Sequence, residues 1–554
     1  MRGMSGLRRM ADAGLTTLTL AMALALAGCG DREPAATVTD LTDDLGGSQI
    51  GDDVADTAPE EDAGPPLSDV ALDPEPPPEA SDRCGDVPVD GRCEGDVVAY
   101  CESVETGVAR KPCPEGQECA MVDGYADCRN LGSAGCGRVT WDGFCEGTVA
   151  VYCDGDATAV VRHDCADDGT TCGFVDDATG FWCLPRPTGE GAMTARGSFW
   201  FEKPAVTPAG LGEVSELPAR RARVQLRRAD DDVLIASGVT DDTGAFAIRF
   251  DDPGVDVYAL AMTFVDDDRN AIAVRDCPRA DCEDAGYVHA VFSEAMAPAG
   301  QLDFGGWVAT REGSAAAFNI FDVFLRGQDF ATEVFGVRPP PLTGQWEDGS
   351  ATICDALSCF SDRDDTIYVL GLAADGDAFD DPVLAHEFGH YLEAVFSRSD
   401  SPGGAHDGTP TDPRLAWGEG YGTWAGCELL DSPRYIDTFA TGAMVIDVSA
   451  TGVRASRQGG LTQLLSEYVV AEALWTLSRG AGAISPLGGA AVFDAMRGWF
   501  TASGFRDRGV RGLDFVDFLD GIMCRSTSRE ATVRATVVDR LRFPYDFGGP
   551  ARCP

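Results

Sequence analysis

Two histidines and a glutamate in one short stretch are the residues of this sequence best suited to chemistry. Residues 383–392 read VLAHEFGHYL. On a helix, His386 and His390 would lie one turn apart on the same face, so both imidazoles could reach one metal ion. Glu387 would then be placed to take a proton from water on that metal. The HExxH pattern therefore predicts a Zn²⁺ site that hydrolyses amide bonds.

A zinc site that keeps one position for water needs a third protein ligand. Our candidate is Glu419, in the segment 415–424 (LAWGEGYGTW). It follows His390 by 29 residues, which is enough for a helix end, a loop and a return helix. Glu428 is a lesser candidate, because a spacing of nine residues turns its side chain to a different direction from that of Glu419.

Both ligand segments begin with a helix-start signal. Asp381-Pro382 precedes the first histidine, and Asp412-Pro413 opens the segment that contains Glu419. An aspartate can cap the first turn of a helix, and proline fits the first helical position. We therefore expect two helices, capped by Asp381 and Asp412, that face each other across the metal.

The two segments together resemble the gluzincins, zinc peptidases in which HExxH is completed by a glutamate from a second helix. "HEFGH" followed by "GEGYGTW" is most similar to the fungalysin branch, over residues 380–430. The resemblance implies one catalytic Zn²⁺, Glu387 as the base, and three metal ligands: His386, His390 and Glu419.

Comparison with known classes also shows a departure and an exclusion. Fungalysins commonly carry an aspartate four residues after the glutamate ligand, where it orients the first histidine. This sequence has Thr423 there, so either another carboxylate serves or zinc is bound more weakly. The metzincin pattern needs glycine and histidine where this chain has Glu393 and Phe396, so that class is excluded.

The expected mechanism needs one more donor. Glu387 would move a proton from water to the leaving amine, and a further group would support the oxyanion. His406, Tyr421 and Tyr468 are all candidates, and the sequence does not rank them. His406 lies in a loop between the two ligand helices, where an exposed histidine without a role is the alternative.

The elements around the motif predict an α+β domain over residues 309–554, zincin-like and mainly helical in its C-terminal lobe. The strand-like segment 366–370 precedes the HExxH helix, and we expect it to be the edge strand that pairs with extended substrate. Apolar residues at helical spacing predict four further helices, at residues 315–335, 461–479, 492–500 and 515–523.

Residues 191–308 alternate apolar and polar residues as half-buried strands do. Strands are expected at residues 224–227, 233–237, 245–250 and 258–265, with Thr240–Gly244 as a hairpin turn. Residues 195–265 resemble the transthyretin-like, carboxypeptidase-regulatory β-sandwich found beside many secreted peptidases. A generic immunoglobulin-like sandwich is the alternative, and either is expected to be a spacer or docking module.

Twelve of the 20 cysteines form a repeat of two modules, residues 84–133 and 134–190. The first three intervals between cysteines are 9, 8 and 12 residues in both. Modules this small need covalent cross-links, so we expect three disulfides in each, with undetermined connectivity. Zinc binding is the weaker alternative because no CxxC pair is present.

The remaining cysteines predict further cross-links. Cys277 with Cys282, and Cys354 with Cys359, are each five residues apart and would close small loops. Cys524 with Cys553 is the preferred third bridge, which leaves Cys427 as a buried thiol on a helix.

The N-terminus predicts export. Residues 1–28 combine arginines with a short apolar run that ends in Leu-Ala-Gly before Cys29, which resembles the lipobox of bacterial lipoproteins. An ordinary signal peptide is the alternative. Residues 29–83 would then be a disordered tether, with 16 acidic residues, eight prolines and no aromatic residue.

Composition limits the function classes. A formal charge of −48 gives no electrostatic reason to bind nucleic acid. Calcium is conceivable but unsupported, because Asp-rich loops alone do not define a site. We therefore predict a zinc peptidase acting on protein or peptide substrates, anchored by the Cys29 lipid at the outer membrane or cell surface. The alternatives are an adhesion protein on a degenerate peptidase fold and a small-molecule hydrolase.

Overall fold

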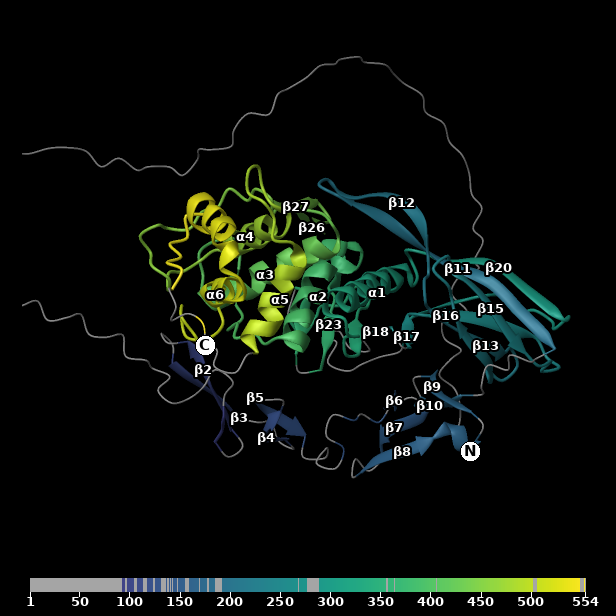
Figure 1. The fold of residues 1–554 in the computed structure, drawn as a ribbon. Coiled ribbons are helices and arrows are strands. Elements are labelled where there is room, and N and C mark those ends of the chain that lie inside the picture. Colours follow the sequence, from purple (N-terminus) through teal and green to yellow (C-terminus); the bar gives the residue numbers. More distant parts are fainter. Residues whose placement is uncertain are drawn as a thin grey trace, which may run out of the picture. The chain divides into compact units, whose positions relative to one another are not determined.

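The computed structural model describes residues 92–184 with short gaps, and residues 192–548 apart from 268, 277–287, 355–356, 363, 405 and 502–505, together with Cys553. The expected signal peptide, lipidated Cys29 and tether lie outside the described residues, as does the Cys277–Cys282 pair. The chain is multidomain: sheets predominate in its N-terminal part and helices in its C-terminal region (Figure 1). Within the described part, no helix is long and apolar enough to cross a membrane.

The cysteine modules are small sheets held by disulfides. The first contains β1 (Arg92–Cys93), β2 (Val97–Ser103), β3 (Gly107–Pro112), β4 (Gln117–Val122) and β5 (Tyr125–Asn130). The second contains β6 (Phe144–Glu146), β7 (Val149–Cys153), β8 (Val160–Asp164), β9 (Thr171–Asp176) and β10 (Gly180–Leu184). In both, a three-stranded sheet is followed by a two-stranded one.

The disulfides of the second module are the three expected, and the structure gives their connectivity: Cys136–Cys153, Cys145–Cys172 and Cys165–Cys183. In the first module, Cys93 is bonded to Cys119, which joins the second and fifth cysteines as Cys145–Cys172 does. The repeated spacing therefore corresponds to a repeated cross-link. The side chains of the other four cysteines in the first module lie outside the described residues.

Two four-stranded sheets follow. The first has the order β12-β11-β15, with β20 also paired to β11, and the second has the order β14-β13-β16-β19. Their strands are β11 (Met193–Thr207), β12 (Gly210–Pro218), β13 (Arg223–Arg228), β14 (Leu234–Val239), β15 (Ala245–Phe250), β16 (Val257–Met262), β19 (Ala290–Phe292) and β20 (Gln301–Ala309). Their inward side chains and the helices share one continuous apolar core.

The expected hairpin at Thr240–Gly244 is wrong, although the turn itself is present. Gly244 has φ +76°, and Asp241 Oδ1 accepts the backbone N–H of Thr243 at 2.8 Å. However, β14 pairs with β13 and β15 pairs with β11, so this turn carries the chain from one sheet to the other. The buried Thr240 hydroxyl fixes the crossing, because it donates to Ala219 O at 2.6 Å and accepts from Ala222 N at 2.9 Å.

A five-stranded sheet of order β17-β18-β21-β23-β22 supports the helical region. It combines β17 (Phe264–Asp266) and β18 (Ala271–Arg275) with β21 (Leu342–Gln345), β22 (Cys359–Ser361) and β23 (Thr366–Tyr368). The segment 366–370 is therefore not the edge strand we expected. The edge is β22, which pairs antiparallel with β23 and thereby covers it.

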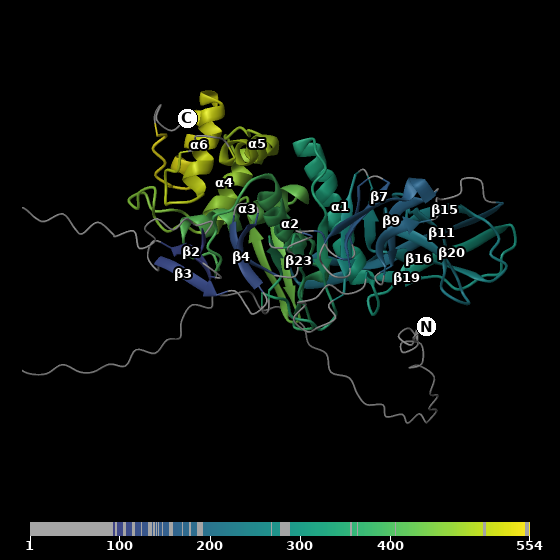
Figure 2. The ribbon, with the colours of Figure 1, turned by 90° about the horizontal axis from the view of Figure 1, so that it is seen from below.

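Helices α1 (Ala315–Phe335) and α2 (Asp381–Phe396) pack beside this sheet. Helix α3 (Pro413–Leu429) packs on α2, and α4 (Glu467–Arg479) packs on α3 (Figure 1). Figure 2 shows α1, α2 and β23 together from below. The remaining elements here include β24 (Gly371–Leu372), β25 (Asp375–Gly376), β26 (Arg434–Phe439), β27 (Gly442–Asp447), α5 (Gly489–Phe500), α6 (Phe515–Arg525) and α7 (Glu530–Val533). Of the expected helices, only 461–479 begins late, because Ser466 caps α4 by accepting the N–H of Tyr468.

Two further cross-links are as expected. Cys354 is bonded to Cys359 and Cys524 to Cys553, while Cys427 is a buried free thiol on α3.

Candidate metal centre

Three side chains from two helices converge on one point. The Nε2 atoms of His386 and His390 on α2 are 3.0 Å apart. Oε2 of Glu419 on α3 lies 3.2 Å from Nε2 of His386 and 3.4 Å from Nε2 of His390. All three predicted ligands are therefore brought together, with their ligand atoms within 4.8 Å of one another.

These separations fit a tetrahedral zinc ion. Zinc binds imidazole nitrogen and carboxylate oxygen at about 2.0–2.1 Å, which places neighbouring ligands roughly 3.3 Å apart in a tetrahedron. The three observed distances, 3.0, 3.2 and 3.4 Å, lie around that value. A set of two imidazoles and one carboxylate also leaves the fourth position for water, as catalytic zinc sites require.

The local sequence explains how α2 and α3 approach so closely. A Cβ at Gly389 of α2 would lie 3.0 Å from the Gly422 backbone, and one at Gly426 would lie 2.9 Å from the His386 amide. A Cβ at Gly422 would meet both histidine rings at 3.1–3.2 Å. Because Gly422 and Gly426 have no side chains, the backbone of α3 can lie against α2, directly beside the two imidazole rings.

The starts of the two helices differ from each other. Asp412 caps α3 as expected, accepting the backbone N–H of Arg414 at 2.9 Å. Asp381 does not cap α2: the N-cap position is Asp380, and the Asp381 carboxylate instead forms an ion pair with Lys203 of β11. Because the carboxylate of Asp381 pairs with this buried lysine, 178 residues earlier in the chain, it does not bond the first turn of α2. The prediction that Asp381 caps this helix is therefore wrong.

The first histidine is oriented by the residue that departs from the fungalysin pattern. Nδ1 of His386 lies 3.1 Å from Oγ1 of Thr423. A proton on Nδ1 can donate to this hydroxyl, which leaves the Nε2 lone pair directed at the metal position. The threonine therefore takes the orienting role without adding a charge.

Burial and mutual charge set the ionisation of the three side chains. Burial lowers the pKa of His386 to about 4, so this ring is neutral near pH 7. Burial opposes the ionised form of Glu419, yet the charge of His390 and hydrogen bonds from both histidines hold the pKa of Glu419 well below its usual range. Burial also opposes the charge on His390, but the Glu419 carboxylate raises its pKa to about 9. A metal ion would displace that proton.

Glu387 lies beside the ligands and is held by the edge strand. Its Oε2 accepts the backbone N–H of Phe360 in β22 at 2.8 Å. Burial raises the pKa of Glu387 to about 7, which suits a group that takes and returns a proton near neutral pH. Phe360 was not predicted, because it contributes a backbone group that leaves no sequence signal.

The three candidate oxyanion donors differ in position. Nε2 of His406 lies 3.4 Å from Oε2 of Glu419, so its loop brings it to the centre. Tyr421 is fully buried, and its ring stacks on Trp417. The Tyr468 ring packs against the backbone of Gly408.

Glu428 and Tyr435 also differ from the sequence-based expectation. Glu428 accepts from Arg479 at 2.9 Å and from Ser478 at 3.2 Å, so it belongs to a separate ion pair. Tyr435 on β26 was missed: its ring centroid is 5.8 Å from that of His386, in an edge-on arrangement. Only the pairing of distant elements brings it there, and no motif in the sequence marks it.

Comparison with known proteins adds little to this geometry. No family model and no curated protein matches the chain. Among solved structures, the chain is similar to a 9R-lipoxygenase from Cyanothece PCC8801, at 13% identity and a TM-score of 0.13. The match covers 26% of this chain and 23% of the lipoxygenase, so the chain spans under a quarter of that protein's length.

Proposed function

We propose that this chain is a zinc-dependent peptidase with a gluzincin-type centre, in which His386, His390 and Glu419 hold one Zn²⁺. The observation that carries the proposal is the convergence of two imidazole nitrogens and one carboxylate oxygen at 3.0–3.4 Å, next to a buried glutamate. The proposal includes a zincin-like fold for residues 309–554, which is supported by the HExxH helix lying beside a sheet with an antiparallel edge strand.

Bound zinc would lower the pKa of a water molecule and polarise the substrate carbonyl. Glu387, one residue from the first ligand, takes the proton of the attacking water. It then passes this proton to the nitrogen of the leaving amine.

His406 is the side chain that we assign to the developing negative charge on the carbonyl oxygen. It reaches the centre from the loop between α2 and α3, and its side chain remains 36% exposed. A donor at the open side of the centre can meet a substrate that enters from solvent. Tyr421 has no such access, because it is enclosed in the core.

We also propose that the protein acts outside the cytoplasm, held by a lipid on Cys29. The disulfides of the second cysteine module, together with Cys354–Cys359 and Cys524–Cys553, suit an oxidising compartment. The substrates would then be extracellular or envelope proteins and peptides.

The test compares casein cleavage and zinc content of the wild type and Glu387→Gln. We expect one zinc per chain in both and a loss of at least about 10³-fold in kcat for the variant, because only the proton-transfer group is removed. Glu428→Gln is the control, a buried carboxylate on α3 that accepts Arg479 Nε at 2.9 Å and Ser478 Oγ at 3.2 Å, and this variant should keep the wild-type kcat. Equal activity of wild type and Glu387→Gln would refute the proposal.

A further inference from the structure

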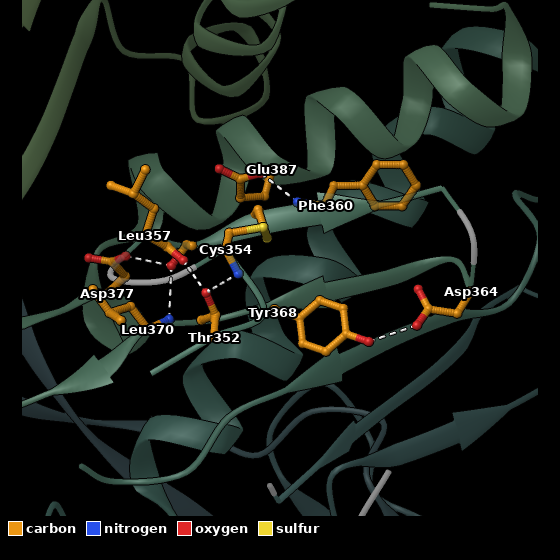
Figure 3. The surroundings of a disulfide bond; sticks show 11 residues. Thr352, Cys354, Leu357, Phe360, Asp364, Tyr368, Leu370, Asp377 and Glu387 are labelled. Atoms are coloured by element: carbon orange, nitrogen blue, oxygen red, sulfur yellow. Dashed lines mark hydrogen bonds between the residues drawn. A yellow bond between two sulfur atoms is a disulfide. The ribbon is translucent and has the colours of Figure 1, made fainter. Parts of the chain in front are cut away.

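The edge strand that holds Glu387 is fixed by a covalent loop. Strand β22 has three residues and begins at Cys359, which is bonded to Cys354. The next residue, Phe360, donates its backbone N–H to Glu387 (Figure 3). A disulfide therefore ends one residue before the peptide group that contacts the proposed base.

Hydrogen bonds also hold this loop, both within itself and to the segment that follows β23. The Thr352 hydroxyl accepts the N–H of Cys354 at 3.1 Å and donates to Leu357 O at 2.5 Å. The Ser358 hydroxyl accepts the N–H of Leu370 at 2.9 Å and donates to Asp377 at 2.5 Å. Figure 3 shows these contacts around the disulfide.

Apolar packing contributes less to this loop than to the helices it faces. The side chains of Ile353 and Leu357 are 45% and 63% exposed. The ring of Phe360 does pack edge-on against Tyr391 of α2, at 5.9 Å between centroids. Strand β22 is short and the loop before it is exposed, so few backbone hydrogen bonds and few apolar contacts fix its position. A disulfide that limits the conformations of this loop therefore has a large effect on where the strand lies.

We propose that the Cys354–Cys359 disulfide is a positioning element: it fixes β22 so that the Phe360 N–H orients the Glu387 carboxylate. Oε2 carries this bond, which sets the direction of the second carboxylate oxygen. The inference rests on the proposed function for its effect on turnover. Its structural part, the position of the Phe360 amide, does not depend on activity.

The test uses the full-length chain with both cysteines replaced, Cys354→Ser with Cys359→Ser, and measures zinc content, kcat, KM and amide exchange. We expect unchanged zinc, about 10- to 100-fold lower kcat with KM changed less, and about ten-fold faster exchange in residues 357–361 but not in α2. The control replaces Cys524 and Cys553 with serine and should change neither kcat nor that exchange. Unaltered kcat, unaltered exchange, or zinc lost in step with activity would each overturn the proposal.

A second pair of variants decides the matter if the serine variant fails to fold. Phe360→Pro removes the N–H donor, whereas Phe360→Ala keeps it and removes only the ring. Lower kcat in the proline variant alone supports the proposal, and equal kcat in the two overturns it. If the wild type cleaves no peptide, the proposed function fails, while the exchange of residues 357–361 still decides whether the disulfide fixes the strand.

Discussion

The hydroxyl of Thr423 lies 3.1 Å from Nδ1 of His386, so a neutral side chain orients the first of the proposed metal ligands. Partners of this kind set the tautomer of a ligand histidine, and their removal commonly weakens metal binding by about 10- to 100-fold. A charged partner would also raise the basicity of the ring, which threonine does not.

Thr423→Val keeps the shape of this side chain and removes the hydrogen bond. We expect zinc affinity to fall by about 10-fold, at the lower end of that range because the lost partner is uncharged. Competition with a chelator measures the change. Thr423→Ser retains the hydroxyl and should bind zinc as the wild type does, so a similar loss in both variants would argue against the orienting role.

Gly422→Ala tests the close approach of α3 to α2. A methyl group there would meet the imidazoles of His390 and His386 at 3.1–3.2 Å, which forces the rings to shift by a few tenths of an ångström. We expect weaker zinc binding and lower kcat, by about 10-fold in each.

Gly418→Ala is the matched control on the same helix. Its new methyl group would meet Ser401 at an ordinary 3.5 Å. Alanine is favoured over glycine in a helix by about 0.5–1 kcal/mol, so this variant should melt slightly higher and keep its zinc. Equal zinc affinity in the two variants would show that the absence of a side chain at Gly422 does not determine the geometry of the proposed metal centre.

His406→Ala separates a catalytic role from an exposed loop histidine. If the ring stabilises charge in the transition state, kcat falls by about 100-fold while the zinc content stays at one per chain. Steady-state kinetics on a peptide substrate, with metal analysis of the same sample, measure both. An unchanged kcat would show that His406 is an exposed loop histidine with no catalytic role.

The half-buried carboxyl of Asp437 on β26 is expected to make the free energy of unfolding depend on pH. Burial, followed by the charges of Asp375 and Asp380, raises the pKa of Asp437 from 3.8 to about 7. Between these values the folded chain binds a proton that the unfolded chain has released, so this group's stabilising contribution is lost as the pH rises from about 4 to 7. Asp437→Asn removes the buried charge.

We therefore expect Asp437→Asn to be more stable than the wild type at pH 8 by roughly 1–2 kcal/mol and nearly equal to it at pH 4. The full shift would give more, but solvent screens this partly exposed carboxylate. Thermal melts at the two pH values, with the exposed turn variant Asp242→Asn as control, measure the difference. An equal increment at both values would contradict the assignment.

The parts of the site that could be predicted from the sequence are local ones. HExxH on a helix and the Asp412 cap each depend on residues within one or two turns, and these follow from local spacing. Glu419 lies 29 residues after His390, and its selection also depended on the resemblance to fungalysins. The repeated cysteine intervals likewise indicated a repeated cross-link. Here the pattern of residue types and the final geometry describe the same short segment.

The errors concern partners that are distant in sequence. Segment 366–370 was expected at the sheet edge, but β22 covers it, and the pattern of one strand does not specify its neighbours. Turn residues 240–244 looked like a hairpin because a turn signal does not say whether the next strand joins the same sheet. Asp381 lost its capping role to an ion pair with Lys203, 178 residues away.

The most direct test of the central claim is zinc content after extensive dialysis, measured for the wild type, Glu419→Ala and Glu428→Ala. Glu428 is a matched control on the same helix, paired with Arg479 instead of the histidines. The account predicts one zinc in the wild type and in Glu428→Ala, and at least about 100-fold weaker binding in Glu419→Ala. A wild type that retains no zinc, or a Glu419→Ala variant that binds it as tightly as the wild type, would contradict the account.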